Sequence, residues 1–224
     1  MEKNRATVLI PAFNEEDIIA ETVKAALDIP GVSRVVVIDD GSTDKTAEIA
    51  EDAGALVIEA TTNLGKGGAL NLGLSMIVGN YLLLLDADLG RTASEGKKLL
   101  DTIIRGQADM AIAQFPDKKR KSGFGLALGL AKKAIRQYTG LNLSSPLSGQ
   151  RALNLRALEA LGCKFAEGFG MEVAMTIDVA KQGLIIREVP VEMEHRETGR
   201  DIAGFIHRGR QFMDILSVLF KRLS

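Results

Sequence analysis

The chain has 224 residues, which is long enough for one large α/β domain or for a domain with a modest extension. Its content of 46% hydrophobic and 25% charged residues is ordinary for a soluble globular protein. Its 28 basic residues nearly balance its 29 acidic residues, so no overall positive field recruits nucleic acid. The single cysteine, Cys163, excludes an internal disulfide and a cysteine-based metal site, which fits a reducing cytoplasm.

Short apolar segments alternate with helical patterns along the first half of the chain. Strands are predicted at residues 7–10, 34–38 and 56–58, and Pro11 is expected to end the first of them. A helix is predicted from about residue 43 to 53, capped by Ser42 or Thr43. Because strands that alternate with helices form βαβ units, this pattern predicts an α/β fold with a mostly parallel central sheet flanked by helices.

Polar residues follow the first two predicted strands, at the edge where open α/β sheets bind their ligands. Glu16 and Asp17 lie in the first turn of the next helix, where negative charge suits the helix dipole. Asn14 and Glu15 lie nearer the strand end and are better placed to face a ligand. The second strand is closed by a pair of carboxylates that ends with Asp40.

A glycine-rich segment with one lysine, NLGKGG at residues 63–68, opens the next predicted helix. Glycines allow close approach of the backbone, a helix N-terminus attracts anions, and Lys66 supplies a positive charge. These are the parts of a phosphate cradle. The spacing is neither that of a P-loop nor that of a dinucleotide-binding fingerprint.

Four consecutive leucines at residues 82–85 are followed by Asp86, Ala87 and Asp88. A segment that is apolar on both faces suits a central strand of a parallel sheet. Side chains at positions i and i+2 of an extended segment point the same way, so Asp86 and Asp88 can converge at the carboxyl end of this strand. They either hold a divalent cation such as Mg²⁺ or Mn²⁺, or simply end a strand and solvate a turn.

The second half of the chain continues the pattern less regularly. A helix is predicted at residues 94–105, a strand at 108–113, a helix at 124–138 and a last strand at 184–191. The basic residues 116–123 form either a solvated loop or a mobile flap over a phosphorylated substrate.

Five polar residues of the second half are candidates for the site. Glu172 lies in the first turn of a periodic helix, where it either matches the dipole or faces a ligand. His195, one of two histidines, follows the last predicted strand in a charged loop. On charge alone, Arg151, Arg196 and Arg200 are candidates for an acceptor site that binds phosphate or carboxylate.

The final residues, 205–224, form an amphipathic helical pattern. Such a helix packs on its own domain, packs on a second subunit to form a homodimer, or lies on a membrane surface. The N-terminus has no signal-peptide core, and no apolar run reaches the roughly 20 residues of a membrane-spanning helix. We therefore expect a cytoplasmic protein. If the helix lies on a membrane surface, the protein contacts the inner face of the membrane peripherally.

Four motifs in order, PAFNEE at residues 11–16, DDGSTD at 39–44, NLGKG at 63–67 and DAD at 86–88, carry a resemblance to a known family. They resemble the nucleotide-sugar-binding half of family 2 glycosyltransferases with the GT-A fold. The resemblance implies a single GT-A domain over residues 1–224, with a Rossmann-like nucleotide-sugar-binding half to about residue 115. An acceptor-binding half would follow at about 116–204, and the C-terminal amphipathic helix after it.

The second half resembles two groups of that family. GFGME at residues 168–172 with EHR at 194–196 resembles glucosyl-3-phosphoglycerate synthases, in which the histidine joins the aspartates on the metal. The length and REVPV at 187–191 are similar to the catalytic domains of dolichyl-phosphate mannosyltransferases. The acceptor motif of the first group has no match near residues 124–128, and Gly90 stands where the second group often has glutamine. The signature of processive polysaccharide synthases is missing as well.

The resemblance implies a metal-dependent glycosyltransferase that moves a hexose from a nucleoside-diphosphate sugar, in the first place a UDP-sugar, to an acceptor. That acceptor would be a small phosphorylated molecule or a polyprenyl phosphate. Mg²⁺ or Mn²⁺ held by Asp86, Asp88 and His195 would act as a Lewis acid on the diphosphate, with Asp88 as the central catalytic residue. The implied contacts with the nucleotide sugar are Pro11, Ala12, Asn14, Glu15, Asp40, Lys66, Asp86 and Ala87.

The stereochemistry stays open at this point. An inverting enzyme needs a general base, for which Glu172 and Glu167 are candidates, whereas a retaining enzyme of the glucosyl-phosphoglycerate type would use Glu172 to orient the sugar or the acceptor. Two other classes of function also stay open. One is a non-catalytic protein that binds a sugar nucleotide, and the other is a nucleotidyltransferase, whose glycine- and arginine-rich loop is absent from this sequence.

Overall fold

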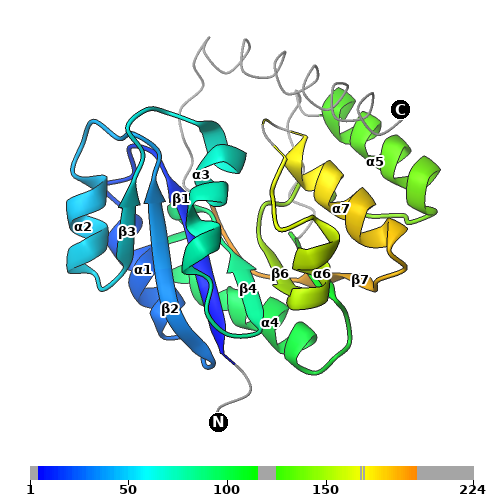
Figure 1. Cartoon of the computed structure of the whole chain (residues 1–224), viewed down its shortest axis with the longest axis horizontal. Coiled ribbons are helices and arrows are strands. Elements are labelled where there is room, and N and C mark those ends of the chain that lie inside the picture. The colour runs from blue at the N-terminus through cyan, green and yellow to red at the C-terminus, as the bar shows by residue number, and fades with distance from the viewer. Residues whose placement is uncertain (1–4, 116–124, 167, 169, 196–224) are drawn as a thin grey trace.

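The computed structural model describes residues 5–115, 125–166, 168 and 170–195. In these ranges the chain forms a seven-stranded sheet with helices on both faces (Figure 1). The strands are β1 (Ala6–Ala12), β2 (Val32–Asp39), β3 (Leu56–Glu59), β4 (Tyr81–Leu84), β5 (Met110–Gln114), β6 (Arg151–Asn154) and β7 (Ile186–Pro190). The helices are α1 (Ile19–Leu27), α2 (Thr46–Asp52), α3 (Gly65–Gly73), α4 (Gly96–Ile104), α5 (Gly125–Thr139), α6 (Leu155–Ala160) and α7 (Met171–Lys181). Two 3₁₀ segments, η1 (Leu74–Met76) and η2 (Ala87–Glu95), flank β4.

The strand order is β3-β2-β1-β4-β6-β5-β7. Strand β6 runs antiparallel to both β4 and β5, and the other described pairs are parallel, so the predicted mostly parallel sheet is confirmed. The chain winds outward from β1 to β3 and then returns to place β4 on the other side of β1. The carboxyl ends of β1 and β4 therefore form a topological switch point, which is where open α/β sheets bind ligands.

The leucine segment shows why helices cover both faces of the sheet. Leu83 and Leu85 pack into the apolar cluster that includes α1 and α4, whereas Leu82 and Leu84 pack against α3, α6 and α7. All four side chains are at most 2% exposed. Each of these burials contributes about 2 kcal/mol to folding, so the segment anchors the centre of the domain. A third cluster joins α5 to the outer side of α7.

Two predicted boundaries near the switch point are wrong. Strand β1 continues through Pro11, because the backbone of Pro11 faces the side of β4, and β4 no longer pairs with β1 beyond Leu9. No ladder hydrogen bond is lost there. Helix α2 begins at Thr46, since Ser42 and Thr43 bind the loops beside them instead of capping the helix.

No helix in the described ranges is both long and apolar enough to cross a bilayer. The predicted basic loop at residues 116–123 and the predicted C-terminal helix at 205–224 lie outside the described residues. The predictions of homodimerisation and of membrane contact depend on that helix and stay predictions.

Candidate active site

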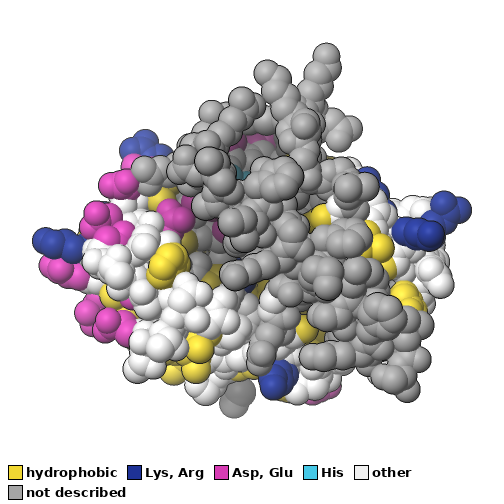
Figure 2. All heavy atoms as spheres, turned by 90° about the horizontal axis from the view of Figure 1, so that it is seen from above, with side chains coloured by type: hydrophobic (Ala, Val, Ile, Leu, Met, Phe, Trp, Pro, Cys, Tyr) yellow, Lys and Arg dark blue, Asp and Glu magenta, His cyan; other side chains and the backbone are white. Residues whose placement is uncertain are grey.

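Two carboxylates and an imidazole meet at the switch point. One potential ligand atom from each of Asp86, Asp88 and His195 lies within 4.8 Å of the others. His195 Nδ1 lies 2.9 Å from Asp88 Oδ1, and this hydrogen bond raises the pKa of His195. Figure 2 looks down on this edge of the sheet, and histidine and acidic side chains are visible there side by side. This donor set suits a divalent cation that also binds phosphate oxygens.

The two aspartates converge in a way that strand alternation did not predict. Strand β4 ends at Leu84, and Asp86 keeps an extended backbone, but Asp88 already lies in the 3₁₀ segment η2. The turn, and not the pleat of a strand, brings the second carboxylate back toward the first. Ala87, between them, is buried, and its carbonyl accepts a hydrogen bond from the Thr22 hydroxyl at 2.7 Å.

Lys66 lies beside the metal-ligating group. Its Nζ donates a short hydrogen bond to Asp86 and lies 3.8 Å from Glu172 Oε1. Burial alone would lower the pKa of Lys66, but the charges of Asp86 and Glu172 outweigh burial and raise it. Burial alone would raise the pKa of Asp86, and the charge of Lys66 instead holds it below its ordinary value. Both groups therefore stay charged.

The predicted phosphate cradle at the start of α3 is filled by the protein itself. The backbone N–H groups of Leu64 and Gly65 donate to the Asp40 carboxylate at 2.7 and 2.9 Å. Asp40 is only 5% exposed, so it holds this loop and has little surface left for a nucleotide. The Lys66 side chain is the part of the predicted cradle that faces the metal-ligating group.

The first two strand ends are tied to each other. Asn14 has a left-handed backbone (φ 55°), its N–H donates to Ser42 Oγ at 2.9 Å, and its side-chain oxygen accepts from the Thr43 N–H at 2.8 Å. The Glu15 N–H donates to Thr46 Oγ1 at 2.8 Å. These bonds join the loop after β1 to the loop after β2 and give the carboxyl edge a fixed shape on this side.

The side chain of Arg151 does not lie at a surface that an acceptor could contact. It is fully buried, and its guanidinium donates to the carbonyls of Ser148 and Pro146 and to the Thr176 hydroxyl. Burial lowers its pKa to about 10. The prediction of a direct acceptor contact is therefore wrong for Arg151, because its donors are used inside the protein. Arg196, Arg200 and Glu167 lie outside the described residues.

Gln150 is a site residue that sequence reasoning missed. Its Nε2 donates a short hydrogen bond to Asp86 Oδ2, so Asp86 is held by Lys66 on one oxygen and by Gln150 on the other. Nothing in the local sequence signals this contact, since the two residues are 64 positions apart. Thr92 was missed as well, and it exchanges hydrogen bonds with the backbone of Glu194 next to His195.

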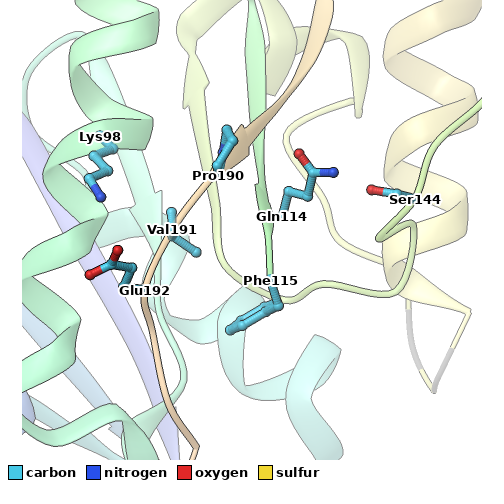
Figure 3. A pocket seen from close by; sticks show the side chains of 7 residues that line it. All are labelled: Lys98, Gln114, Phe115, Ser144, Pro190, Val191 and Glu192. Atoms are coloured by element: carbon cyan, nitrogen blue, oxygen red, sulfur yellow. The ribbon is translucent and has the colours of Figure 1, made fainter. Parts of the chain in front are cut away.

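A cavity of about 380 Å³ opens at the carboxyl ends of β5 and β7 (Figure 3). Its lining combines apolar side chains with an amide, a hydroxyl and two charged groups, namely Phe115, Pro190, Val191, Gln114, Ser144, Lys98 and Glu192. The ring centroid of Phe115 also lies 5.4 Å from that of His195, so the cavity borders the metal-ligating group.

An open α/β sheet with paired aspartates at its switch point is the arrangement of the GT-A glycosyltransferases. The sequence matches the family model "Glycosyl transferase family 2" over residues 7–162, and the chain belongs to that family. The predicted family and the predicted class of enzyme, a glycosyltransferase, are confirmed.

Relatives and solved structures are consistent with this membership. The chain is 32% identical to Glycosyltransferase AglJ of Haloferax volcanii, over 87% of this chain and 64% of that protein. It is 30% identical to the undecaprenyl-phosphate mannosyltransferase of Micrococcus luteus, over 87% of this chain and 86% of that protein. The fold matches glucosyl-3-phosphoglycerate synthase of Mycobacterium tuberculosis, crystallised with Mn²⁺, UDP and phosphoglyceric acid. That match has a TM-score of 0.79 and 25% identity, over 98% of this chain and 78% of the other.

Proposed function

We propose that the protein is a metal-dependent glycosyltransferase that moves a hexose from a UDP-sugar to an acceptor that bears a phosphate. The observation that carries this proposal is the group of Asp86, Asp88 and His195 beside the charged Lys66. This group lies at the switch point of the sheet, in a chain that belongs to glycosyltransferase family 2. This arrangement supports the proposal, because a cation held by these residues would lie beside Lys66 and both would attract a departing diphosphate.

The residues present fit Mg²⁺ or Mn²⁺. Asp88 and His195 share a hydrogen bond and would offer a carboxylate oxygen and an imidazole nitrogen, with Asp86 completing the set. A cation held there supplies a Lewis acid for the diphosphate as the glycosidic bond breaks. Mn²⁺ and Mg²⁺ occur with UDP in crystals of the mycobacterial synthase, which supports this choice.

The leaving group gathers negative charge, and Lys66 is the positively charged side chain placed to receive it. In the free protein its Nζ is shared by Asp86 and Glu172. A diphosphate oxygen that replaces one of these carboxylates would keep the lysine paired. Preorganised charges of this kind stabilise a transition state because they need no reorganisation when the charge develops.

Glu172 is assigned to orienting the lysine and the sugar. Its side chain is 12% exposed in the first turn of α7, and its carboxylate is engaged with Lys66 at 3.8 Å. A general base must reach the acceptor hydroxyl, whereas this carboxylate faces a cation of the donor side. An acceptor that is itself a phosphate needs no strong base. The anomeric configuration of the product, measured by NMR, tests this assignment, since an inverted product formed on a neutral hydroxyl would require a base.

Two acceptors of different size satisfy the same chemistry. Undecaprenyl phosphate appears in the names of relatives from Micrococcus luteus and Shewanella sediminis, and this favours a polyprenyl phosphate. Phosphoglyceric acid lies in crystals of the mycobacterial synthase, and this favours a small phosphorylated acid. We place the polyprenyl phosphate first, because the acceptor motif of the synthases has no match in this sequence.

The first experiment is a thermal-shift panel of UDP-, GDP- and ADP-sugars with and without Mn²⁺. A ligand that binds only the native state raises the melting temperature in proportion to the logarithm of its concentration. We expect the largest shift for UDP-sugars with Mn²⁺ and no shift in Asp88→Ala, whereas Asp101→Ala on α4 should behave as wild type. Transfer to undecaprenyl phosphate and to phosphoglycerate is then measured with the sugar that binds. If the protein binds a sugar nucleotide but neither transfers the sugar nor hydrolyses the sugar nucleotide in a metal-dependent way, a non-catalytic sugar-nucleotide-binding protein is favoured instead.

A further inference from the structure

Arg151 is the largest fully buried polar side chain in the described part of the chain, and the mechanism above does not use it. Its guanidinium donates hydrogen bonds to two carbonyls, a hydroxyl and a thioether, none of which carries a charge. Burying a guanidinium without a carboxylate in contact is costly, and an apolar side chain of similar volume would often serve a core as well. The guanidinium is instead used as a fork of donors that bind several separate groups of the protein.

The fork holds the turn that leads into β6. Nε donates to the Ser148 carbonyl and one terminal nitrogen donates to the Pro146 carbonyl, both at 2.9 Å. The Ser148 hydroxyl then donates to Gln150 Oε1 at 3.1 Å, which turns the amide so that Nε2 points at Asp86. The position of the Asp86 carboxylate thus depends on the turn that Arg151 fixes.

The same guanidinium is also linked to the helix that carries Glu172, the second carboxylate beside Lys66. Its second terminal nitrogen donates to Thr176 Oγ1 at 3.0 Å, and the Thr176 hydroxyl donates to the Glu172 carbonyl at 2.8 Å. The Glu172 carboxylate is one of the two that hold Lys66. Arg151 is therefore bonded, through neutral groups, to both elements that flank the lysine.

A carboxylate fixes the turn from its far end. Glu188 on β7 accepts from the N–H groups of Ser144 and Ser145 at 2.8 and 2.6 Å. Residues 144–150 are thus held at one end by Glu188 and at the other by Arg151. Gly149, inside this turn, leaves room for Lys66, since a Cβ there would overlap Nζ and lie 3.1 Å from Asp86 Oδ1.

We propose that Arg151 is a positioning residue for sugar transfer, which sets Gln150 and Glu172 on either side of the Lys66–Asp86 pair without touching a substrate. This proposal rests on the proposed function. It predicts that Arg151 affects the metal site and the rate constant, although it contacts neither a metal ligand nor the substrate.

The test compares Arg151→Lys, which keeps the charge and loses the fork, with Arg156→Lys as a matched control. Arg156 is exposed on α6 and pairs with Asp109 at 3.3 Å, away from the site. We expect Arg151→Lys to raise the Kd for Mn²⁺, measured by electron paramagnetic resonance, by about tenfold and to lower kcat by a similar factor. The KM for the sugar nucleotide should change less than kcat, and the control should match wild type in all three.

A double variant separates positioning from general destabilisation. If Arg151 acts through Gln150, the loss in Gln150→Leu/Arg151→Lys should be clearly smaller than the product of the two single losses. Losses that multiply, or a Kd and kcat equal to those of Arg156→Lys, would overturn the proposal. If Arg151→Lys does not fold, Thr176→Val removes one hydrogen-bond acceptor of Arg151 instead. Its Kd for Mn²⁺ and its kcat are then compared with those of Arg156→Lys in the same way.

The two proposals fail in different ways. A wild-type protein that binds Mn²⁺ and transfers no sugar speaks against the proposed function, and positioning is then judged on the Mn²⁺ affinities of the variants alone. A wild-type protein that binds no Mn²⁺ overturns both.

Discussion

The two halves of the sheet hold their site residues by different means. On the side of β1, β2 and α3, each loop at the carboxyl edge is bonded to the next loop along the chain, through partners 24 to 31 residues apart. On the side of β5, β6 and β7, Gln150 and His195 reach their partners Asp86 and Asp88 across 64 and 107 residues. The first arrangement is local, whereas the second exists only when the whole sheet is assembled.

Under the proposed function, this difference would separate binding of the nucleotide from assembly of the reactive centre. The loops of the first half are shaped before any ligand arrives, because their polar groups are already paired with one another. The second half completes the charge arrangement around Asp86 and Asp88. Changes in the first half should therefore affect stability and KM, and changes at the junction should affect metal binding and kcat.

The largest effect is expected from breaking the junction at Asp88. Asp88→Ala removes a carboxylate from the metal-ligating group and frees His195 from its hydrogen bond. We expect transfer to fall on the order of a thousandfold or more, because several kcal/mol of charge stabilisation would be lost. Activity and Mn²⁺ affinity are measured together with those of Asp101→Ala. Retained Mn²⁺ binding in Asp88→Ala would place the cation elsewhere.

The next effect is expected at Gly149, where the second half meets Lys66. Gly149→Ala places a methyl group too close to Nζ, so the end of the lysine side chain must shift, and we expect it to move away from Asp86. We expect kcat to fall about ten- to a hundredfold, as for the loss of one preorganised charge, with little change in melting temperature. Gly129→Ala on α5 is the control, since a Cβ there meets nothing within 4 Å. An unchanged kcat would mean that Lys66 does not act from this position.

Asp40→Asn tests the local half. In wild type, each oxygen of Asp40 accepts from one N–H group at the start of α3. The amide of asparagine has one oxygen and can accept from only one of them, and its NH₂ group then faces the second N–H, so one of the two hydrogen bonds that cap the helix is lost. We expect the free energy of unfolding, measured by urea denaturation, to fall by about 1–2 kcal/mol. The KM for the sugar nucleotide should rise while Mn²⁺ affinity is kept. Asp52→Asn at the exposed end of α2 serves for comparison, and an equal loss in both variants would argue against the cap.

The smallest effect is expected at Thr92. Its hydroxyl binds the backbone of Glu194 and so holds the segment that carries His195. Thr92→Val should raise the Kd for Mn²⁺ roughly two- to fivefold, below the effect of a group bonded directly to a ligand. Thr102→Val removes only a hydrogen bond within α4 and is the matched variant. An effect as large as that of Asp88→Ala would show that this segment depends on Thr92 alone.

Much of the first half could be predicted, because its elements follow from short-range patterns. The leucines at 82–85 predicted a buried central strand, and the polar residues after each strand predicted the ligand edge. What failed there were two boundaries, namely the end of β1, which continues through Pro11, and the cap of α2. Ser42 and Thr43 have the right chemistry for a helix cap, but Ser42 donates to Asp39 at the end of β2 and Thr43 donates to Asn14 in the loop after β1.

The second half was less predictable for a physical reason. A charged side chain is usually exposed, so Arg151 was expected to face an acceptor, and only the tertiary structure shows that its donors are spent on buried carbonyls. Gln150 carries no local signal, since its partner comes from another part of the sheet. The clustering of His195 with the aspartates was expected from the family resemblance and not from spacing.

The reversed direction of β6 has a further consequence. Arg151 pairs with Leu84, so the beginning of β6, and not its end, lies at the edge where the neighbouring strands finish. The last part of the connection that enters β6, residues 144–150, is fixed by Glu188 and Arg151, so changes in length and composition are expected only ahead of residue 144. If the proposed function is correct, variation in what such enzymes accept would arise ahead of residue 144, while the turn that positions Asp86 stays the same.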